Sequence, residues 1–348
     1  MAVLQRNTRV GSPGKAEGLH APWSVQLELT EGCNKLCTFC GLNGIRSAPG
    51  KPYHFMPPDL AEITATQLAV LCPKARVEFA MHGEPTLNPQ WREIIGIFRQ
   101  HLPDTQFQLT TNGRSWIRKT NNGENGVQAN AIKAFEAGID IVILDTYEPE
   151  RRKLQELAKA CSRVNVMDFY EECIPKGISP YYNYHRKITG LVIIMDDIGL
   201  RSGESASRTL MNHAGNAADQ PVPSVPYSRT CTQPFREITV CYDGDVNICC
   251  MDWGHEYTCG NVKDQTLHSI WWGPEFTAAR KVLQQKERGF SPCDRCNAKS
   301  GTRAGLLPKL SLPNKKDLEA IRQVHEKPQT NHLPRKVWDS LTRLINGN

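Results

Sequence analysis

The chain alternates between short apolar runs and longer segments whose apolar residues recur at helical spacing. Val25–Leu29 alternates apolar and polar residues, as a half-buried strand does. Trp91, Ile94 and Phe98 recur every three or four residues, which indicates the buried face of a helix. The pattern predicts strands at Val25–Leu29, Arg76–Met81, Phe107–Thr111, Ile139–Leu144, Val164–Met167 and Leu191–Met195. It predicts helices at Leu60–Leu71, Gln90–Leu102, Gln128–Ala137 and Pro149–Ala160.

Regular alternation of strands and helices predicts a parallel sheet covered by helices, because parallel neighbours need a crossover connection. Six such units fit an α/β fold, a partial (β/α)6 TIM-like barrel with its chemistry at the carboxyl ends of the strands. Downstream, Asp243-Gly244 indicates a hairpin turn and Gly273-Pro274 the start of a helix, so we expect a small β-hairpin/helix domain. The predicted organisation is a flexible lead-in (1–22), the barrel (23–226), the small domain (227–300) and a basic helical tail (301–348).

Composition narrows the class of protein. Hydrophobic residues make up 39% of the chain and charged residues 22%, which is typical of globular proteins. The first fourteen residues contain no apolar core of a secretory signal, and the longest apolar run, Gly190–Met195, is too short to cross a bilayer. We therefore expect a cytoplasmic protein without a membrane partner. Thirteen cysteines in a reducing compartment indicate metal or cluster ligation instead of disulfides.

The positive charge is concentrated at the C-terminal end. Residues 297–348 carry ten Lys/Arg and four Asp/Glu, which accounts for the whole formal net charge of +6. A basic segment of this kind can attract the phosphates of DNA or of a modified nucleotide through counterion release. It can equally be a solvated helical tail, and the residue spacing by itself favours the tail.

Three cysteines, Cys33, Cys37 and Cys40, directly follow the first predicted strand. Thiolates at this spacing can converge on one soft-metal centre, and an iron–sulfur cube needs four ligands, so three protein ligands leave one iron open. Zinc competes for such a site, but structural zinc prefers four closed protein ligands. A three-cysteine run that opens a β/α domain therefore favours a cluster. The aromatic Phe39 beside Cys40 is either a core residue or a shield for that cluster.

Polar residues follow three later strands of the predicted barrel. The run Gly83-Glu84-Pro85 comes after the second strand, where glycine permits close backbone approach and a carboxylate can accept from an ammonium group. By itself this run is also an ordinary turn. Thr111 and Asn112 end the third strand and Asp145 ends the fourth; they are candidates for ligand contact or for turn and cap roles.

The cysteine run and the Gly-Glu-Pro run together resemble the signatures of the radical S-adenosylmethionine (radical SAM) superfamily. The resemblance implies that the three cysteines hold a [4Fe–4S] cluster whose open iron binds the amino and carboxylate groups of S-adenosylmethionine. In that family a Gly-Gly-Glu-Pro run holds the amino group, and this chain has His82 in place of the first glycine. The residues that the resemblance assigns to cofactor binding are Gly83, Glu84, Pro85, Thr111, Asn112, Asp145 and Phe39.

Four later cysteines, Cys231, Cys249, Cys293 and Cys296, are able to enclose a metal centre completely. Four thiolates also suit zinc well. The spacing alone does not decide whether Cys249 or its neighbour Cys250 is the ligand. This half of the chain resembles the twitch or shortened SPASM module of radical SAM enzymes, which implies one auxiliary [4Fe–4S] cluster. The remaining cysteines are expected to be buried apolar residues: Cys72, Cys161, Cys173, Cys241 and Cys259.

The resemblance implies an enzyme that cleaves S-adenosylmethionine with an electron from an external flavodoxin- or ferredoxin-type donor and abstracts hydrogen from a substrate. Three substrate classes compete: a peptide, a small alcohol or sugar that is dehydrogenated, and a modified DNA base. The overall pattern, including the run Met81–Thr86 and the loop Asn212–Asn216, is also similar to bacteriophage radical SAM proteins linked to thymine hypermodification, which favours rearrangement of an aminoacyl-modified thymine. His213, in a polar loop, can either face the substrate or be a solvated loop residue, and we expect the latter. A zinc-binding nucleic-acid module is the non-enzymatic alternative.

Overall fold

The structure is a computed structural model, and it describes residues 19–37, 39–42, 52–178, 188–196, 210–217, 219–298 and 307–326. Most of the predicted lead-in therefore lies outside the described residues, as do residues 301–306 and 327–348 of the predicted tail. Four of the ten basic residues of the C-terminal segment fall within the described part, namely Lys309, Lys315, Lys316 and Arg322.

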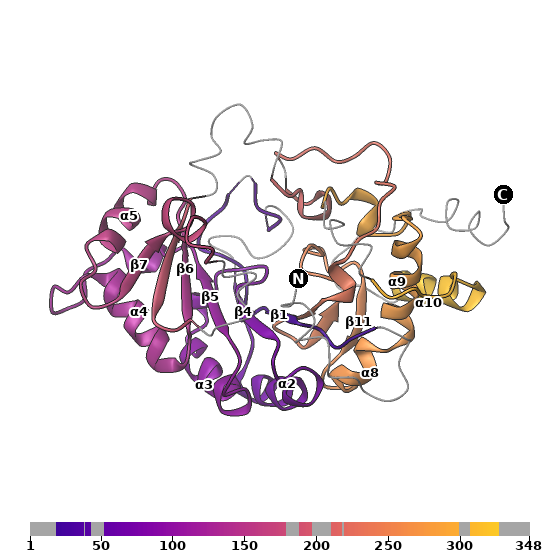
Figure 1. The fold of residues 1–348 in the computed structure, drawn as a ribbon, viewed down its shortest axis with the longest axis horizontal. Helices are drawn as coiled ribbons and strands as arrows, with labels where there is room; N and C mark the ends of the chain where they lie inside the picture. Colours follow the sequence, from indigo (N-terminus) through magenta and orange to yellow (C-terminus); the bar gives the residue numbers. More distant parts are fainter. Residues whose placement is uncertain are drawn as a thin grey trace.

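A seven-stranded parallel sheet forms the centre of the molecule (Figure 1). Its strand order is β7-β8-β6-β5-β4-β1-β9, and every neighbouring pair is parallel. The strands are β1 (Ser24–Leu27), β4 (Arg76–Phe79), β5 (Phe107–Thr111), β6 (Ile141–Asp145), β7 (Asn165–Asp168), β8 (Leu191–Met195) and β9 (Glu237–Val240). Two small antiparallel pairs lie outside this sheet: β2 (Thr30–Glu31) with β3 (His54–Phe55), and β10 (Asp245–Asn247) with β11 (Thr258–Asn261).

The sheet confirms the predicted α/β fold and all six predicted strands, but its order departs from chain order in two places. Strand β8 lies between β6 and β7, so the last two barrel strands are exchanged relative to the chain. Strand β9 extends the opposite edge by pairing with β1, Val25 lying beside Ile238. The predicted small domain (227–300) therefore contributes its first strand to the main sheet.

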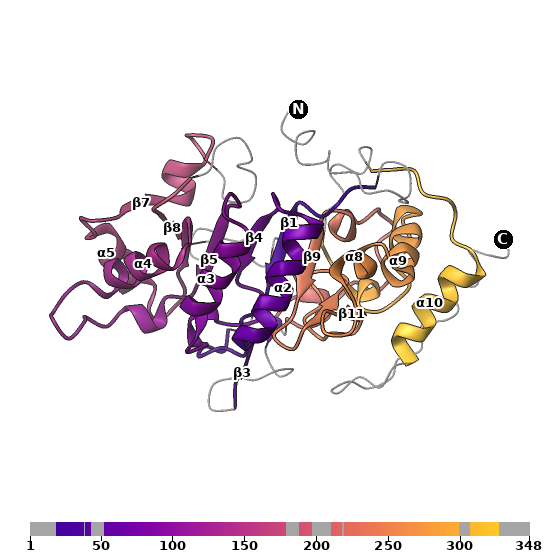
Figure 2. The same cartoon turned by 90° about the horizontal axis from the view of Figure 1, so that it is seen from below.

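Helices follow the strands and cover one side of the sheet (Figures 1 and 2). They are α2 (Pro58–Leu71), α3 (Trp91–His101), α4 (Gly126–Ala137) and α5 (Arg151–Lys159). Helix α4 ends at Gly138, whose φ of 114° is left-handed backbone that favours glycine. Helix α5 begins two residues later than the sequence predicts. Short helical turns lie at η1 (Pro85–Leu87), η2 (Arg114–Trp116), η3 (Phe169–Cys173), η4 (His213–Gly215), η5 (Gln233–Phe235) and η6 (Cys293–Arg295).

The C-terminal part packs beside the β9 edge of the sheet and contains the helices α8 (Leu267–Trp271), α9 (Pro274–Gln284) and α10 (Lys315–Glu326) (Figure 2). The buried guanidinium of Arg280 on α9 donates to the carbonyl oxygens of Pro234 (2.7 Å) and Trp271 (2.6 Å). Helix α10 packs on α9 through its apolar face, with an ion pair between Lys281 and Asp317 (2.9 Å). Among the described residues, no helix has the length and apolar character needed to span a membrane.

The core between the sheet and its helices generates a first prediction. The Phe79 side chain is fully buried on β4 and packs edge-on against Phe98 (ring centroids 5.6 Å apart) and Phe107 (5.3 Å). Phe79→Ala is expected to lower the free energy of unfolding by about 3–5 kcal/mol, because it removes a buried ring and leaves a cavity. Anaerobic denaturant titration measures the change. The control Phe55→Ala, at a side chain with 37% exposure, should cost less than about 1 kcal/mol; equal losses would contradict the placement of Phe79 in the core.

Candidate active site

A cavity of about 220 Å³ lies at the carboxyl ends of β4, β5 and β6, beside the cysteine run that follows β1. Parallel strands bring their carboxyl ends to one edge of the sheet, which is why residues so distant in sequence meet there. The predicted residues that line the cavity are Cys33, Cys37, Phe39, Cys40, Gly83, Glu84, Thr111, Asn112 and Asp145. Pro85 is buried at the start of η1 and is not part of the lining.

Gly83 brings the Gly-Glu-Pro run into direct backbone contact with the start of the cysteine run. Gly32 and Gly83 form an isolated parallel β-bridge, and the Glu84 N–H donates to the Gly32 carbonyl (2.9 Å). A Cβ on Gly83 would lie 2.1 Å from the carbonyl oxygen of Thr30 and 2.6 Å from that of Gly32. Both obstacles are backbone atoms, so no side chain larger than hydrogen fits at this position.

The carboxylate of Glu84 is buried within a ring of donors. One oxygen, Oε1, accepts from the backbone N–H (3.1 Å) and hydroxyl (2.5 Å) of Thr86 and from the Thr111 hydroxyl (2.7 Å). The other oxygen accepts from the backbone N–H of Asn112 (2.8 Å). Burial raises the pKa of Glu84, while these hydrogen bonds oppose the shift. The ring fixes the carboxylate at the cavity wall, where it suits a cationic ligand group.

The three thiols of the cysteine run lie in the cavity wall and are largely shielded from water. Burial raises the pKa of Cys33 to about 12 and that of Cys40 to about 11, and it also raises the pKa of Cys37. Cys33 Sγ accepts from Asn112 Nδ2 and from the Lys35 backbone N–H, each at 3.4 Å. Thiols that resist ionisation in the bare protein become thiolates when a metal binds, because binding displaces the proton. The donor set therefore fits an iron–sulfur cluster.

Lys35, which sequence reasoning missed, anchors the cysteine run to the loop after β6. Its ammonium group is nearly fully buried, forms an ion pair with Glu150 (2.5 Å) and donates to the carbonyl oxygens of Tyr147 (3.3 Å) and Glu148 (3.0 Å). Burial acts to raise the pKa of Glu150, but the hydrogen bond and charge of Lys35 hold it below its ordinary value. No periodicity or motif signals this contact, since its partners are separated by more than a hundred residues.

Aromatic side chains form the wall on the β6 side. The Phe39 ring packs against Tyr147 with centroids 5.2 Å apart, and the Tyr147 hydroxyl donates to the Asp145 carboxylate. Burial, then the charge of Asp145, raises the pKa of Tyr147 well above its ordinary value, so the phenol stays protonated. Phe39 and Asp145 thus line the cavity, and their role in cofactor binding stays a prediction, whereas Tyr147 was not recognised in the sequence.

The opposite wall comes from His213 and Trp253, whose rings lie 4.8 Å apart. The expectation that His213 is a solvated loop residue is wrong, because its ring lines the cavity and burial lowers its pKa to about 4. Its imidazole is therefore neutral at physiological pH. The Cβ of His213 and the ring of Trp253 pack against Gly41, directly after Cys40, where a Cβ would lie 2.7 Å from either side chain. The polar loop and the C-terminal part thus close over the cysteine run.

The four downstream cysteines also meet in space, all of them buried. Burial, then the neighbouring thiols of Cys250, Cys293, Cys231 and Cys296, raises the pKa of Cys249 well above its ordinary value. The pKa of Cys250 is raised by burial and by Glu237 and Glu78, and its Sγ lies 3.7 Å from Gln233 Nε2. The sulfur of Cys249 thus faces the other three thiols, and that of Cys250 faces polar side chains. Whether these four residues are cluster ligands stays a prediction.

Positive and N–H groups surround this second cysteine group. Burial raises the pKa values of Cys293 and Cys296, and the charge of the buried Arg288 guanidinium opposes this shift. Cys296 Sγ accepts from the Ala298 backbone N–H (3.4 Å). Asn212 and Asn297 exchange hydrogen bonds at 2.8 and 3.0 Å, which ties the polar loop that carries His213 to this group. One loop therefore contacts both the cavity and the second cysteine group.

Comparison with known proteins gives four matches. Residues 231–297 match the SPASM family, an iron–sulfur cluster-binding domain. The chain is 22% identical over 276 residues to the S-adenosyl-L-methionine-dependent 2-deoxy-scyllo-inosamine dehydrogenase of Niallia circulans, covering 78% of this chain and 92% of that protein. It is similar in fold to BtrN in complex with AdoMet and 2-DOIA (TM-score 0.59, 21% identity, 80% of this chain and 94% of that one). It is also similar in fold to selenomethionine BtrN in an open conformation (TM-score 0.51, 19% identity, 85% of this chain and 97% of that one).

The close contact at Gly83 generates the second prediction. Gly83→Ala is expected to reduce the iron content and the thermal midpoint together, because the new methyl group forces the Gly-Glu-Pro run away from the cysteine run. Iron analysis and anaerobic thermal unfolding measure the two effects. The matched control is Gly96→Ala, on helix α3, where a Cβ meets no atom within 4 Å and should stabilise the helix by up to about 1 kcal/mol. An unaffected Gly83→Ala protein would refute the contact.

Proposed function

The chain is a radical SAM enzyme with a C-terminal SPASM-type domain, and from this premise we propose that it abstracts a hydrogen atom from a substrate held in the cavity described above. Its cofactors are S-adenosylmethionine and [4Fe–4S] clusters, one of them auxiliary. The observation that carries the proposal is that one cavity is lined by the cysteine run, by the Gly-Glu-Pro run, and by His213 and Trp253 from the C-terminal side.

We assign the ligands of the first cluster to Cys33, Cys37 and Cys40. Glu84 is placed to accept from the amino group of S-adenosylmethionine, because its carboxylate is held rigidly by four donors at the cavity wall. Gly83 keeps the backbone close enough for that contact. The remaining predicted cofactor residues are assigned to the ribose, carboxylate and adenine: Thr111, Asn112, Asp145, Phe39 and, through the turn that it starts, Pro85.

When bound, S-adenosylmethionine supplies a 5′-deoxyadenosyl radical after one-electron cleavage of its sulfonium. The protein's contribution is to orient the reacting groups and to keep water out. Tyr147 on the β6 side, and His213 with Trp253 on the other side, provide largely aromatic walls with a protonated phenol and a neutral imidazole. We propose that these walls bind the substrate, since they line the same cavity as the cysteine run.

The auxiliary cluster is assigned to Cys231, Cys249, Cys293 and Cys296. Four protein ligands leave no iron open, so its role is electron transfer or structure, not cofactor binding. Arg288 offsets the negative charge of the thiolates there. The external electron donor is proposed to be of the flavodoxin or ferredoxin type.

Two candidate reactions follow hydrogen abstraction. The first is rearrangement of an aminoacyl-modified thymine in phage-type DNA hypermodification. It is supported by the sequence resemblance, which includes the Asn212–Asn216 loop. The basic C-terminal segment, as a DNA contact, supports it as well. Most of that segment lies outside the described residues. The second is dehydrogenation of a small alcohol or sugar, with the auxiliary cluster accepting the electron. It is supported by the overall similarity to the inosamine dehydrogenase.

The assignment of the first cluster generates the third prediction. Cys37→Ala should abolish formation of 5′-deoxyadenosine under strong reductant and remove about four of about eight irons, because a cube loses its anchoring when one of three ligands is gone. Chromatography and iron analysis measure both. Cys161→Ala changes a cysteine outside both cysteine groups, so it should keep both the formation of 5′-deoxyadenosine and the iron content. Retained cleavage in Cys37→Ala, or a wild-type protein with zinc and no iron, would refute the enzyme assignment in favour of a zinc module.

The two candidate reactions differ in product mass, which gives the fourth prediction. Incubation with an aminoacylated thymidine should yield a product of unchanged mass and new retention time, because rearrangement is redox-neutral. Dehydrogenation of 2-deoxy-scyllo-inosamine would instead remove two hydrogen atoms. High-resolution mass spectrometry of anaerobic reactions distinguishes the two, with the Cys37→Ala protein as the control. A two-hydrogen loss would replace the first candidate by the second.

A further inference from the structure

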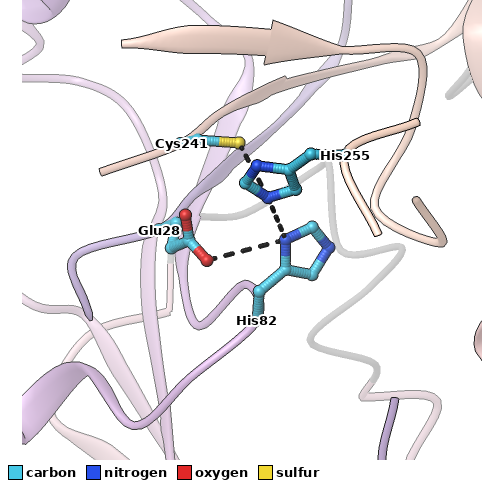
Figure 3. A group of neighbouring side chains, drawn as sticks. All are labelled: Glu28, His82, Cys241 and His255. Atoms are coloured by element: carbon cyan, nitrogen blue, oxygen red, sulfur yellow. Dashed lines mark hydrogen bonds and ion pairs between the residues drawn. The ribbon is translucent and has the colours of Figure 1, made fainter. Parts of the chain in front are cut away.

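We propose that the chain holds a third metal centre, a Zn²⁺ ion bound by Glu28, His82, Cys241 and His255 (Figure 3). The four ligand atoms, one from each side chain, all lie within 4.8 Å of one another. The group is separate from both cysteine groups and does not line the cavity of the active site. The sequence reasoning missed it: Cys241 was expected to be a buried apolar residue, and His82 appeared only as a departure from the Gly-Gly-Glu-Pro pattern.

Three of the four side chains are brought together by the parallel sheet. Glu28 directly follows β1, His82 comes three residues after β4, and Cys241 directly follows β9. Because β9, β1 and β4 are neighbours in that order, their carboxyl ends present these residues at one edge. His255 comes from the loop between β10 and β11, on the C-terminal side. The group therefore spans the barrel and the small domain.

Three of the six distances within the group match the edges of a zinc tetrahedron. With Zn–N near 2.05 Å and Zn–S near 2.3 Å, tetrahedral coordination puts two nitrogens about 3.4 Å apart and a sulfur and a nitrogen about 3.6 Å apart. The structure has His82 Nδ1 and His255 Nε2 at 3.4 Å, and Cys241 Sγ and His255 Nε2 at 3.5 Å. His82 Nδ1 and a Glu28 oxygen are 3.6 Å apart, close to the roughly 3.4 Å expected for an N–O edge.

Two of these three distances suit direct hydrogen bonds poorly. The His82–Glu28 contact (3.6 Å) and the His82–His255 contact (3.4 Å) are longer than the roughly 2.7–3.2 Å typical of hydrogen bonds between nitrogen and oxygen atoms, whereas the Cys241–His255 contact (3.5 Å) also has the length of a hydrogen bond to sulfur. The three contacts join the side chains in series, and all four ligand atoms lie close enough together for one ion to contact each of them. Figure 3 shows the imidazole of His255 between the Cys241 sulfur and the His82 ring.

Neighbouring groups orient the ligand atoms. His82 Nε2 lies 3.0 Å from the Cys250 carbonyl oxygen, which can only accept, so Nε2 carries the proton and Nδ1 presents its lone pair to the group. The second carboxylate oxygen of Glu28 accepts from the Tyr242 backbone N–H (3.1 Å). A metal-bound histidine ordinarily donates its other ring N–H to such a carbonyl, and a metal-bound carboxylate is ordinarily hydrogen-bonded in the same way.

Burial and backbone conformation add independent support. Glu28, His82 and Cys241 are each at most 1% exposed. A thiolate and a carboxylate together neutralise Zn²⁺, so a dry site of this composition carries no net charge, which burial requires. His82 and His255 both adopt left-handed backbone, with φ of 58° and 52°. Such conformations are uncommon for residues with a Cβ and persist where a functional site requires them.

The donor set identifies the metal. One sulfur, two imidazole nitrogens and one carboxylate oxygen form a mixed set that suits zinc, and four protein ligands make a closed, structural site. Its position indicates its role. His82 directly precedes Gly83 and Glu84, and its ring packs on Trp253 (4.8 Å), which also contacts His213. A zinc ion there would hold the Gly-Glu-Pro run against the C-terminal wall of the cavity.

The test is elemental analysis of anaerobically purified full-length protein, grown with zinc, combined with zinc X-ray absorption. We expect about one zinc per chain in addition to the irons, with one sulfur neighbour near 2.3 Å and nitrogen or oxygen neighbours near 2.0 Å. Cys241→Ala and His255→Ala should each lose the zinc and keep the iron. Cys72→Ala, at a buried cysteine outside all three groups, should keep both metals.

Three outcomes would overturn the proposal: wild-type protein without zinc, zinc retained in both ligand variants, or a zinc spectrum with four sulfur neighbours, which would place the ion in a cysteine group. Loss of zinc with iron retained cannot come from failed folding, because both iron clusters need the folded chain. The iron count and the cleavage of S-adenosylmethionine are separate readouts, so failure of the zinc site and failure of the proposed function are distinguishable.

Discussion

The parallel pairing of β1 with β4 on one side and β9 on the other is the interaction on which the rest of this structure depends. It brings the cysteine run after β1 against the Gly-Glu-Pro run after β4, close enough for Gly32 and Gly83 to form a backbone bridge. It also draws the segment after Cys231 into the main sheet. Strand β9 therefore joins the two parts of the chain through backbone hydrogen bonds, which do not depend on any particular side chain.

This arrangement buries ionisable groups, which disfavours their charged forms. Seven thiols proposed as cluster ligands, the Glu84 carboxylate and the Lys35 ammonium group are all wholly or partly removed from water. The protein balances the charges locally: Lys35 with Glu150, Glu84 with four donors, and the second cysteine group with Arg288. Thiols whose pKa values lie well above neutrality favour metal binding as the way to become thiolates, which links cofactor loading to the stability of this part of the fold.

The cavity lies between two parts of the chain that contribute different properties. The barrel supplies the proposed cluster ligands and the rigid carboxylate, and the C-terminal side supplies the aromatic and imidazole wall. Gly41 allows that wall to press on the cysteine run, and the Asn212–Asn297 hydrogen bonds fix the loop that carries His213. The proposed zinc centre would strengthen the same junction from the opposite side of the Gly-Glu-Pro run. The proposed sites of substrate contact and electron transfer therefore lie at a boundary that several independent interactions stabilise.

The sequence by itself determined what depends on short-range pattern. Apolar periodicity located the six barrel strands and four helices, and cysteine spacing indicated the two cysteine groups, because ligands of one centre can be close in the chain. The tertiary structure decided which distant residues share a cavity. It placed β8 between β6 and β7, added β9 to the sheet, and brought His213, Tyr147 and Trp253 into the walls of the cavity. It also assembled Glu28, His82, Cys241 and His255, which no spacing rule connects, since strand order in a sheet is set by long-range packing and not by local pattern.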